Sequence, residues 1–293
     1  MPILTKIKRL WRFPKLIGVK FIWLALLIKL RKSLSSTQLD FYTYFYFLLK
    51  TDFTYSESEN LYFVTQSNGK HIAIRNYPSS DALVYNQIFI KEEYLNVIQL
   101  AKKHLAGQSR INIIDVGANV GYSVRYWQNC FPEFDLRIIA IEPDSNNLLM
   151  TKKNNELYGA HNVQLEASGL HNKSCFLKVT KGFMGGKEWG FQVEETLDQT
   201  DLKSIELSDI IKKYKLKTID ILKIDIEGSE RFIFQDKDYA MKFLENVSIL
   251  ALEIHDLYPI RQLIYDRLTE NGFSYFDNYE TTFAYRKSLI KVI

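Results

Sequence analysis

Short, nearly continuous apolar runs alternate with amphipathic stretches from residue 111 to the C-terminal end of the chain. The runs are rich in Ile, Leu and Val, which is typical of parallel strands that are buried on both faces. The predicted strands are Ile111–Asp115, Leu136–Glu142, Asn162–Glu166, Ile219–Asp225, Val247–Ile254, and segments around Ser274–Phe276 and Thr282–Tyr285. The predicted helices are Gly121–Cys130, Ser145–Tyr158 with Ser145 as N-cap, Ser208–Tyr214, Gly228–Gln235 and Ile260–Asn271. This alternation predicts a doubly wound α/β domain, in which ligands bind at the carboxyl ends of the strands.

The first 80 residues have a different pattern. Residues 36–80 are rich in Tyr and Phe, and alternation in Leu61–Val64 and His71–Arg75 around an Asn-Gly turn predicts a β-hairpin. Because few basic residues are interleaved with these aromatic side chains, we interpret them as packing surface. A change of composition at Tyr77–Asp81 predicts a boundary. The predicted parts are a basic amphipathic segment (1–35), an aromatic-rich extension (36–80) and the α/β domain (81–293).

Composition and charge narrow the class of protein. With 293 residues, 46% of them hydrophobic, the chain can bury a full core. Its two cysteines, Cys130 and Cys175, are too few for a disulfide framework and predict a reducing, cytoplasmic location. Residues 1–35 hold nine Lys and Arg and no acid, which leaves a net charge of −5 on the rest of this +4 chain. An acidic body argues against a nucleic-acid partner.

The basic segment contains an apolar stretch, residues 16–30, that two lysines interrupt. Its longest uncharged run, Phe21–Ile28, is far shorter than the roughly 20 residues that span a bilayer, and no cleavage site of a secretory signal follows. On a helix, Arg9, Lys20 and Arg31 share one stripe. Apolar residues cover much of the rest: Phe21, Trp23, Leu24, Leu27 and Ile28. Two interpretations stay open: peripheral contact with an anionic membrane, or a helix that packs on its own domain or a partner.

A glycine-containing loop, IDVGANVGY at residues 114–122, follows the first strand of the α/β domain. Gly117 allows a sharp turn and a close approach of the backbone to a ligand, and Gly121 starts a helix close against the sheet. Asp115 would repel a pyrophosphate, and Asn119 stands where a dinucleotide motif has its second glycine. The loop therefore favours a cationic or zwitterionic ligand.

The next strand ends in IEPD at Glu142, where a carboxylate can accept hydrogen bonds from both hydroxyls of a ribose. Taken alone, either Asp115 or Glu142 is also consistent with an acid that caps a helix at the sheet edge. The combination of both acids with the glycines favours a nucleoside site.

Four motifs, DVGANVG, IEPD, LKIDIEGSE (222–230) and LEIH (252–255), resemble those of the FkbM family of S-adenosylmethionine-dependent methyltransferases. The resemblance extends from about Asp81 to the C-terminus, and KIDIEG is its most specific part. It implies a Rossmann-like class I methyltransferase fold, an α/β fold with a seven-stranded, mostly parallel sheet and helices on both faces. One departure is the stretch Leu207-Ser208-Asp209, where the family often shows Leu-Asp-Asp.

The resemblance also implies a binding site for S-adenosylmethionine. Its methionine part would lie on the glycine loop, its ribose at Glu142, and its transferable methyl group beside Asp225. The adenine ring would lie at the end of the third strand, in the segment Glu166-Ala167-Ser168. The implied donor-binding residues are Asp115, Gly117, Asn119, Gly121, Glu142, Glu166, Ala167 and Asp225.

The candidate catalytic groups follow two strands: Asp225 and Glu227 after one, Glu253 and His255 after another. Alternation puts the members of each pair on the same side. A hydroxyl acceptor benefits from a base, and His255 is the most convenient one near neutral pH, with Asp225 and Glu227 beside it. A structural or substrate-orienting role for His255 stays open. The four residues could also hold magnesium or manganese, but nothing in their spacing requires a metal, and no metal ligand is assigned.

The predicted hairpin through Cys175–Val179 leads into an irregular stretch, residues 181–200. Within it, residues 182–190 contain four glycines between bulky side chains, with Trp189 or Phe191 available to stack on a sugar. This segment is either a loop that closes over the site or a plain flexible connection.

The leading functional hypothesis is O-methylation of a hydroxyl-bearing small molecule or glycan, namely a saccharide or glycolipid made at a membrane. One alternative is an NAD-dependent sugar oxidoreductase or epimerase. Its Tyr-x-x-x-Lys signature occurs only at Tyr46–Lys50, before the glycine loop instead of after it. The other alternative is a non-catalytic, Rossmann-like binding module.

Overall fold

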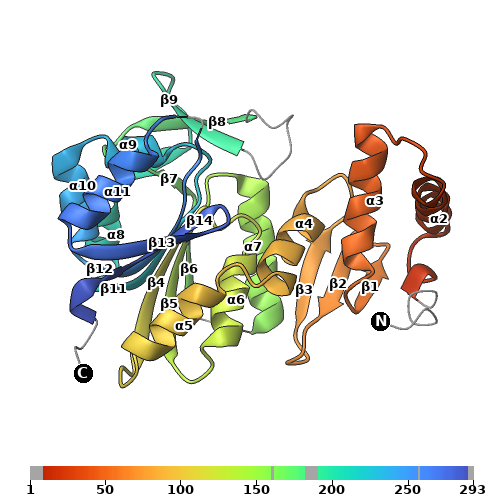
Figure 1. Cartoon of the computed structure of the whole chain (residues 1–293), viewed down its shortest axis with the longest axis horizontal. Coiled ribbons are helices and arrows are strands. Elements are labelled where there is room, and N and C mark those ends of the chain that lie inside the picture. Colours follow the sequence, from red (N-terminus) through yellow and green to blue (C-terminus); the bar gives the residue numbers. More distant parts are fainter. Residues whose placement is uncertain (1–8, 160–161, 182–190, 257, 290–293) are drawn as a thin grey trace. The chain divides into compact units, whose positions relative to one another are not determined.

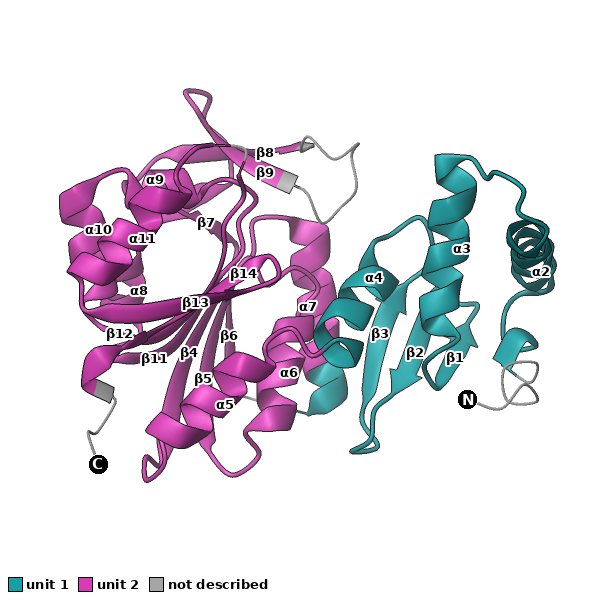
Figure 2. Cartoon of the chain, viewed as in Figure 1, with its two compact units in different colours: residues 1–91, 156–159 teal, residues 92–155, 160–293 magenta. Residues whose placement is uncertain are grey.

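The computed structural model of the protein describes residues 9–159, 162–181, 191–256 and 258–289 (Figure 1). The chain forms two compact units, residues 1–91 with 156–159, and residues 92–155 with 160–293 (Figure 2). Residues 81–91 group with the first unit, whereas the sequence analysis set its boundary at residue 80. The functional division of the chain into three parts stays a prediction.

The first unit packs helices against a three-stranded sheet. Its elements are α2 (Lys15–Lys29), α3 (Ser36–Leu48), β1 (Phe53–Ser56), β2 (Leu61–Thr65), β3 (His71–Arg75), α4 (Asp81–Tyr85) and η1 (Asn86–Ile90). Strands β2 and β3 pair antiparallel, which confirms the predicted hairpin. Tyr44 and Phe45 of α3 are fully buried with Phe53 and Tyr62 of the sheet. The aromatic residues of this region therefore form a core, as interpreted from the sequence.

The second unit contains a seven-stranded sheet in the order β13-β14-β12-β11-β4-β5-β6. Its strands are β4 (Arg110–Val116), β5 (Asp135–Ile141), β6 (Val163–Glu166), β11 (Ile219–Ile224), β12 (Val247–Glu253), β13 (Phe273–Asn278) and β14 (Thr281–Arg286). Neighbouring strands from β12 to β6 are parallel, and β14 is antiparallel to both β12 and β13. The predicted seven-stranded, mostly parallel sheet is confirmed.

Helices cover both faces of this sheet (Figure 1). They are α5 (Leu95–His104), α6 (Tyr122–Cys130), α7 (Ser145–Tyr158), α8 (Leu207–Lys213), α9 (Glu230–Phe234), α10 (Lys237–Leu244) and α11 (Arg261–Glu270). Ile114 and Leu222 pack in one apolar cluster with residues of α8 to α11. The alternate positions, Asp115 and Lys223, therefore point to the opposite face, which α5 and α6 cover. This alternation decides which polar side chains reach the interior beneath the glycine loop.

A smaller sheet, in the order β7-β10-β8-β9, adjoins the strand ends (Figure 1). Its strands are β7 (Ser168–Leu170), β8 (Phe176–Lys181), β9 (Phe191–Thr196) and β10 (Lys203–Ile205). The prediction of an irregular stretch over residues 181–200 is wrong at β9, which pairs antiparallel with β8. The glycine-rich segment 182–190, with Trp189, lies outside the described residues, so neither interpretation of it is tested.

Two further details differ from the sequence expectations. The N-cap of α7 is Asp144, whose side chain accepts a hydrogen bond from the backbone N–H of Asn147, and Ser145 is the first helical residue. Helix α10 was not predicted from the sequence. It begins at Lys237, shortly after α9 ends at Phe234. Asp236 caps α10 by accepting a hydrogen bond from the backbone N–H of Tyr239.

Leu222 lies in the central strand β11 and is fully buried. We expect Leu222→Ala to destabilise the protein by about 2–5 kcal/mol, because it leaves a cavity in the core. Urea denaturation measures this, with Leu149→Ala on the exposed side of α7 as a matched control that changes little. Equal stability of the two variants would contradict the described core.

Candidate functional site

The glycine loop connects β4 to α6 and takes its shape from two glycines with positive φ angles, +75° at Gly117 and +80° at Gly121. A Cβ atom at Gly117 would lie 1.8 Å from the carbonyl oxygen of Asp225, so only glycine fits beside the end of β11. A Cβ atom at Gly121 would lie 2.8 Å from the side chain of Thr151. Gly121 therefore allows close packing on α7, whereas the sequence analysis expected close packing on the sheet.

Asp115 is buried beneath the loop and does not line the pocket formed by the described residues. Its Oδ2 accepts a hydrogen bond of 2.9 Å from the indole N–H of Trp127, and its Oδ1 lies 3.5 Å from the Lys223 ammonium. The side chain of Asp115 therefore does not face the pocket, and its expected direct contact with a bound donor stays a prediction. Its contacts with Trp127 and Lys223 stabilise the elements that carry the loop.

The side chain of Lys223 links the glycine loop to the end of β11, a role that was not predicted from the sequence. Its ammonium donates hydrogen bonds to the carbonyl oxygens of Gly117, at 2.6 Å, and Val116, at 3.3 Å. It also lies 3.6 Å from a carboxylate oxygen of Asp225. Burial lowers the pKa of Lys223, but Asp225 and Asp115 more than offset this, and the pKa is raised. The ammonium therefore stays charged and holds two strand ends together.

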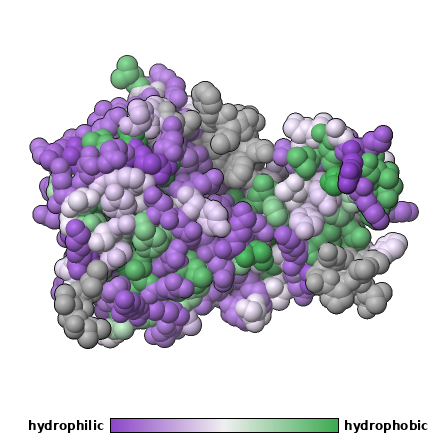
Figure 3. All heavy atoms as spheres, in the orientation of Figure 1, coloured by the Kyte–Doolittle hydropathy of each residue, from purple (hydrophilic) through white to green (hydrophobic). Residues whose placement is uncertain are grey.

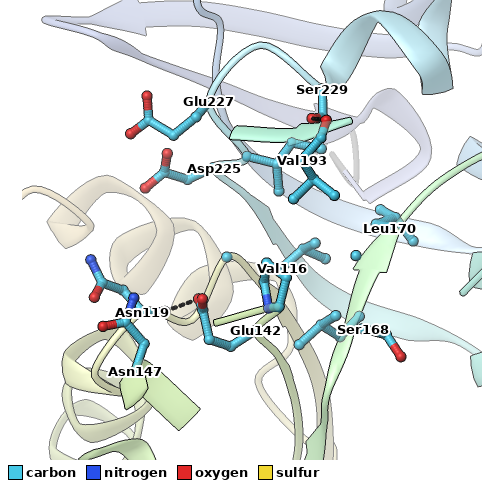
Figure 4. Close-up of a pocket in the computed structure, with 15 residues that line it drawn as sticks. Val116, Asn119, Glu142, Asn147, Ser168, Leu170, Val193, Asp225, Glu227 and Ser229 are labelled. Atoms are coloured by element: carbon cyan, nitrogen blue, oxygen red, sulfur yellow. Dashed lines mark hydrogen bonds between the residues drawn. The ribbon is translucent and has the colours of Figure 1, made fainter. Parts of the chain in front are cut away.

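Glu142 lines the pocket close to the loop (Figure 4). Its carboxylate accepts hydrogen bonds from the backbone N–H groups of Asn119, at 2.8 Å, and Asp144, at 3.0 Å. Burial raises its pKa to about 7, against the effect of these hydrogen bonds. Glu142 thus accepts backbone hydrogen bonds outside the helices and does not cap α7, whose N-cap is Asp144. It also borders the pocket, and its role as a ribose ligand stays a prediction.

One pocket unites half of the predicted site residues: Gly117, Asn119, Glu142, Asp225 and Glu227. It runs from Asn119 and Glu142 at one end to Asp225 and Glu227 at the other (Figure 4). Pocket residues that the sequence analysis did not assign include Asn147 at the start of α7, Gly169 and Leu170 of β7, Val193 of β9 and Ser229. The strands of the smaller sheet supply several of these, and that sheet was only partly predicted.

Glu166 and Ala167 do not line this pocket, although the following residue, Ser168, does. Glu166 is buried, and its carboxylate accepts hydrogen bonds from Lys213, at 2.6 Å, and from the hydroxyl of Tyr214. These partners on and after α8 hold its side chain. The third-strand end of the pocket is therefore formed by residues 168–170 instead.

His255 lies among carboxylates beside the pocket. Its Nε2 is 3.3 Å from Glu227, 3.6 Å from Glu253 and 3.9 Å from Asp225. Its Nδ1 is 2.9 Å from Oε1 of Glu230, which is fully buried and was not predicted. Figure 4 shows the carboxylates of Asp225 and Glu227 pointing the same way, although both residues follow the end of β11 and Glu227 has a positive φ angle, so strand alternation is not the cause.

The electrostatics of this cluster bear on the choice of base. Burial lowers the pKa of His255, but Glu230 and the other carboxylates raise it to about 10. Burial, followed by the charge of Asp225, raises the pKa of Glu227 to about 7 and that of Glu253 to about 9. An imidazole that is already protonated at neutral pH cannot accept a proton. The raised pKa of His255 therefore favours a carboxylate, Asp225 or Glu227, as the base, with His255 as its cationic neighbour. The identity of the base among Asp225, Glu227 and His255 stays a prediction.

Ligand atoms of Asp225, Glu253 and His255 lie within 4.8 Å of one another, as a metal site would need. The Lys223 ammonium and a protonated His255 already supply positive charge to these carboxylates. The assignment of no metal ligand stays a prediction.

Comparisons with known proteins agree with this geometry. The model of the Methyltransferase FkbM domain matches residues 115–275, more than half of the chain. Methyltransferase 1 of Beauveria bassiana (strain ARSEF 2860) is 23% identical over 146 residues, which are 43% of this chain and 58% of that relative. The match thus spans less than two thirds of the relative's length.

The chain is also similar, at low identity, to two solved structures. Methyltransferase FkbM from Methylobacillus flagellatus KT is 16% identical, with 60% of this chain and 44% of that chain covered and a TM-score of 0.42. The N-terminal domain of human METTL16 is 11% identical, with 78% and 88% covered and a TM-score of 0.43.

The strand order and the acidic strand ends define the Rossmann-like fold of class I methyltransferases, as predicted. The chain belongs to the FkbM family of methyltransferases. The predicted family, enzyme class and methyl donor, S-adenosylmethionine, are confirmed by this membership.

Lys223→Met should weaken the binding of S-adenosylhomocysteine by about tenfold or more, because the ammonium no longer holds the Gly117 carbonyl and two carboxylates are left unpaired. Isothermal titration calorimetry measures the affinity, and a thermal melt checks folding. Lys242→Met on the exposed surface of α10 is the control. An unchanged affinity in folded Lys223→Met would refute the role of Lys223.

The affinity for S-adenosylhomocysteine should rise between pH 6 and pH 8, in proportion to the fraction of Glu142 that is ionised. Ribose hydroxyls donate hydrogen bonds more strongly to the charged carboxylate, and the raised pKa makes protonation compete below about pH 7. Calorimetry across this range should show the trend in the wild type and a flat profile in Glu142→Gln. Identical profiles would remove Glu142 from the ribose site.

Proposed function

We propose that the chain transfers a methyl group from S-adenosylmethionine to a hydroxyl group of a saccharide or glycolipid. The single observation that supports this most is the pocket itself, in which a nucleoside-type end at Glu142 is continuous with two carboxylates at Asp225 and Glu227. Gly117 leaves space where a side chain would clash, and Glu142 borders that space, so these residues suit the donor.

The proposed reaction needs few catalytic groups from the protein. S-adenosylmethionine supplies an electrophilic methyl group on a good leaving group. The acceptor oxygen bonds to the methyl carbon as the carbon–sulfur bond breaks, and the hydroxyl proton passes to the carboxylate of Asp225 or Glu227. Holding the acceptor in line supplies much of the rate, and the base adds to it.

The charge of the cluster supports a hydroxyl acceptor. Carboxylates accept hydrogen bonds from hydroxyl groups, and Asp225, Glu227 and Glu253 all surround His255 beside the pocket. We therefore propose an ether product, and neither an ester nor a methylated nucleic acid.

A membrane setting is part of this proposal. Residues 1–35 are basic and free of acids, which suits peripheral contact with an anionic leaflet where glycolipids are carried. Within the described residues, no helix is long and apolar enough to cross a bilayer. The proposed contact is therefore with the membrane surface.

The proposal is tested by supplying methyl-labelled S-adenosylmethionine together with purified saccharide and glycolipid fractions. We expect label in these fractions that resists mild alkali, because methyl ethers are stable there and methyl esters are not. Label that alkali releases, or label confined to nucleic acid, would contradict the proposal.

Glu227→Gln and Asp225→Asn should each slow methyl transfer, and the variant that removes the base should slow it by about 100-fold or more. The affinity for S-adenosylhomocysteine should change far less in Glu227→Gln, because Glu227 lies at the acceptor end of the pocket. Turnover and calorimetry are measured together, with exposed Glu194→Gln as control. Undiminished turnover in both variants would exclude these carboxylates as the base.

A further inference from the structure

Helix α2 packs through one side onto α3 of the first unit. Gly18, Phe21 and Leu24 are buried, and the ring of Phe21 stacks on Tyr42 with centroids 4.9 Å apart. The sequence analysis counted Phe21 and Leu24 with the apolar surface of a membrane anchor. These two side chains belong to the core of the unit, because they face α3.

A second apolar side of α2 remains exposed. Its six side chains have exposed fractions from 49% at Trp23 to 86% at Leu16. At about 100° per residue they fall within an arc of about 120°, on the side opposite the buried residues. The stripe consists of Leu16, Val19, Ile22, Trp23, Leu26 and Leu30. Figure 3 shows hydrophobic residues in the region that α2 occupies in Figure 1.

Scattered exposed apolar residues are ordinary, but a continuous stripe along a whole helix marks an interaction surface. The packed side of α2 agrees with the interpretation of a helix that packs on its own domain, whereas contact of the exposed stripe with a membrane stays a prediction.

Basic side chains border the stripe. On the helical wheel Lys29 flanks one edge of the stripe and is exposed. Arg31 and Lys32 follow at the C-terminal end of the helix and are exposed as well. By contrast, the ammonium of Lys20 lies 4.1 Å from the centroid of the Phe41 ring on α3, and Arg9 donates a hydrogen bond to the carbonyl oxygen of Leu49. The positive rim therefore comes from Lys29, Arg31 and Lys32, and not from a stripe that includes Arg9 and Lys20.

This combination selects the chemistry of the partner. An apolar stripe with a Trp and flanking lysines suits a lipid surface, where the rings and aliphatic chains enter the headgroup boundary and the ammonium groups meet anionic headgroups. A second copy of the same helix would bring like charges together, since residues 1–35 contain no acid to pair with them.

We propose that the stripe on α2 is a docking face for an anionic phospholipid surface. The helix lies in the plane of the interface, with Phe21 and Leu24 holding it to α3 and Trp23 and Leu26 entering the lipid. The inference rests on the membrane contact of the proposed function, but not on methyl transfer, and it names the side of the helix that makes the contact.

The test is co-sedimentation of the full-length protein with vesicles of phosphatidylcholine, with and without phosphatidylserine. We expect binding that needs phosphatidylserine and falls with added salt. The double variant Trp23→Ser, Leu26→Ser should reduce the vesicle affinity by about tenfold or more, since it loses the two apolar side chains that enter the lipid. Lys29→Glu should reduce it by about fivefold or more. Leu149→Ser, an exposed apolar position on α7, is the matched control and should bind as the wild type does.

Each variant is also titrated with S-adenosylhomocysteine, which should bind unchanged and so reports that the protein is folded. Undiminished vesicle binding by the Trp23/Leu26 variant, or no binding by the wild type, would overturn the inference. Dimerisation without vesicles that this variant abolishes would assign the stripe to a second copy instead. Failure of methyl transfer with intact vesicle binding would count against the proposed reaction alone.

Discussion

A buried lysine organises the functional end of the sheet. Lys223 lies in β11 beside β4, and its ammonium donates hydrogen bonds to the Gly117 and Val116 carbonyls and lies within 3.6 Å of carboxylates of Asp115 and Asp225. One positive charge thus connects the glycine loop, which borders the pocket, with the strand end at Asp225, where we propose that the acceptor reacts. Removing either partner would leave charge buried without compensation, so the arrangement depends on all of its members.

The same constraint explains why glycine is needed in the loop. Drawn towards β11 by Lys223, the backbone at Gly117 runs so close to Asp225 that no side chain fits between them. The close contact of the loop with β11 brings Glu142 and Asp225 into one pocket. Groups that the fold holds in place lower the cost of binding and of aligning the reacting groups.

Much of the fold could be predicted from the sequence, because apolar strands and amphipathic helices have distinct periods. The positions of Gly117, Glu142 and Asp225 in one pocket also followed from the rule that ligands bind at strand ends. The direction in which the Asp115 side chain points could not be predicted, since it depends on which face of β4 is covered by α6. Lys223 was missed because its partners are set by the register between β4 and β11, and residue spacing in one strand does not reveal that register. The contact between Glu230 and His255 was missed as well, because the two residues lie on different elements and their spacing in the sequence does not reveal it.

The central claim is that this pocket binds the nucleoside of a methyl donor. The most direct measurement is a calorimetric titration of the wild-type protein with S-adenosylhomocysteine and, separately, with NAD. The account predicts saturable binding of S-adenosylhomocysteine and none of NAD. Binding of NAD without binding of S-adenosylhomocysteine would contradict it.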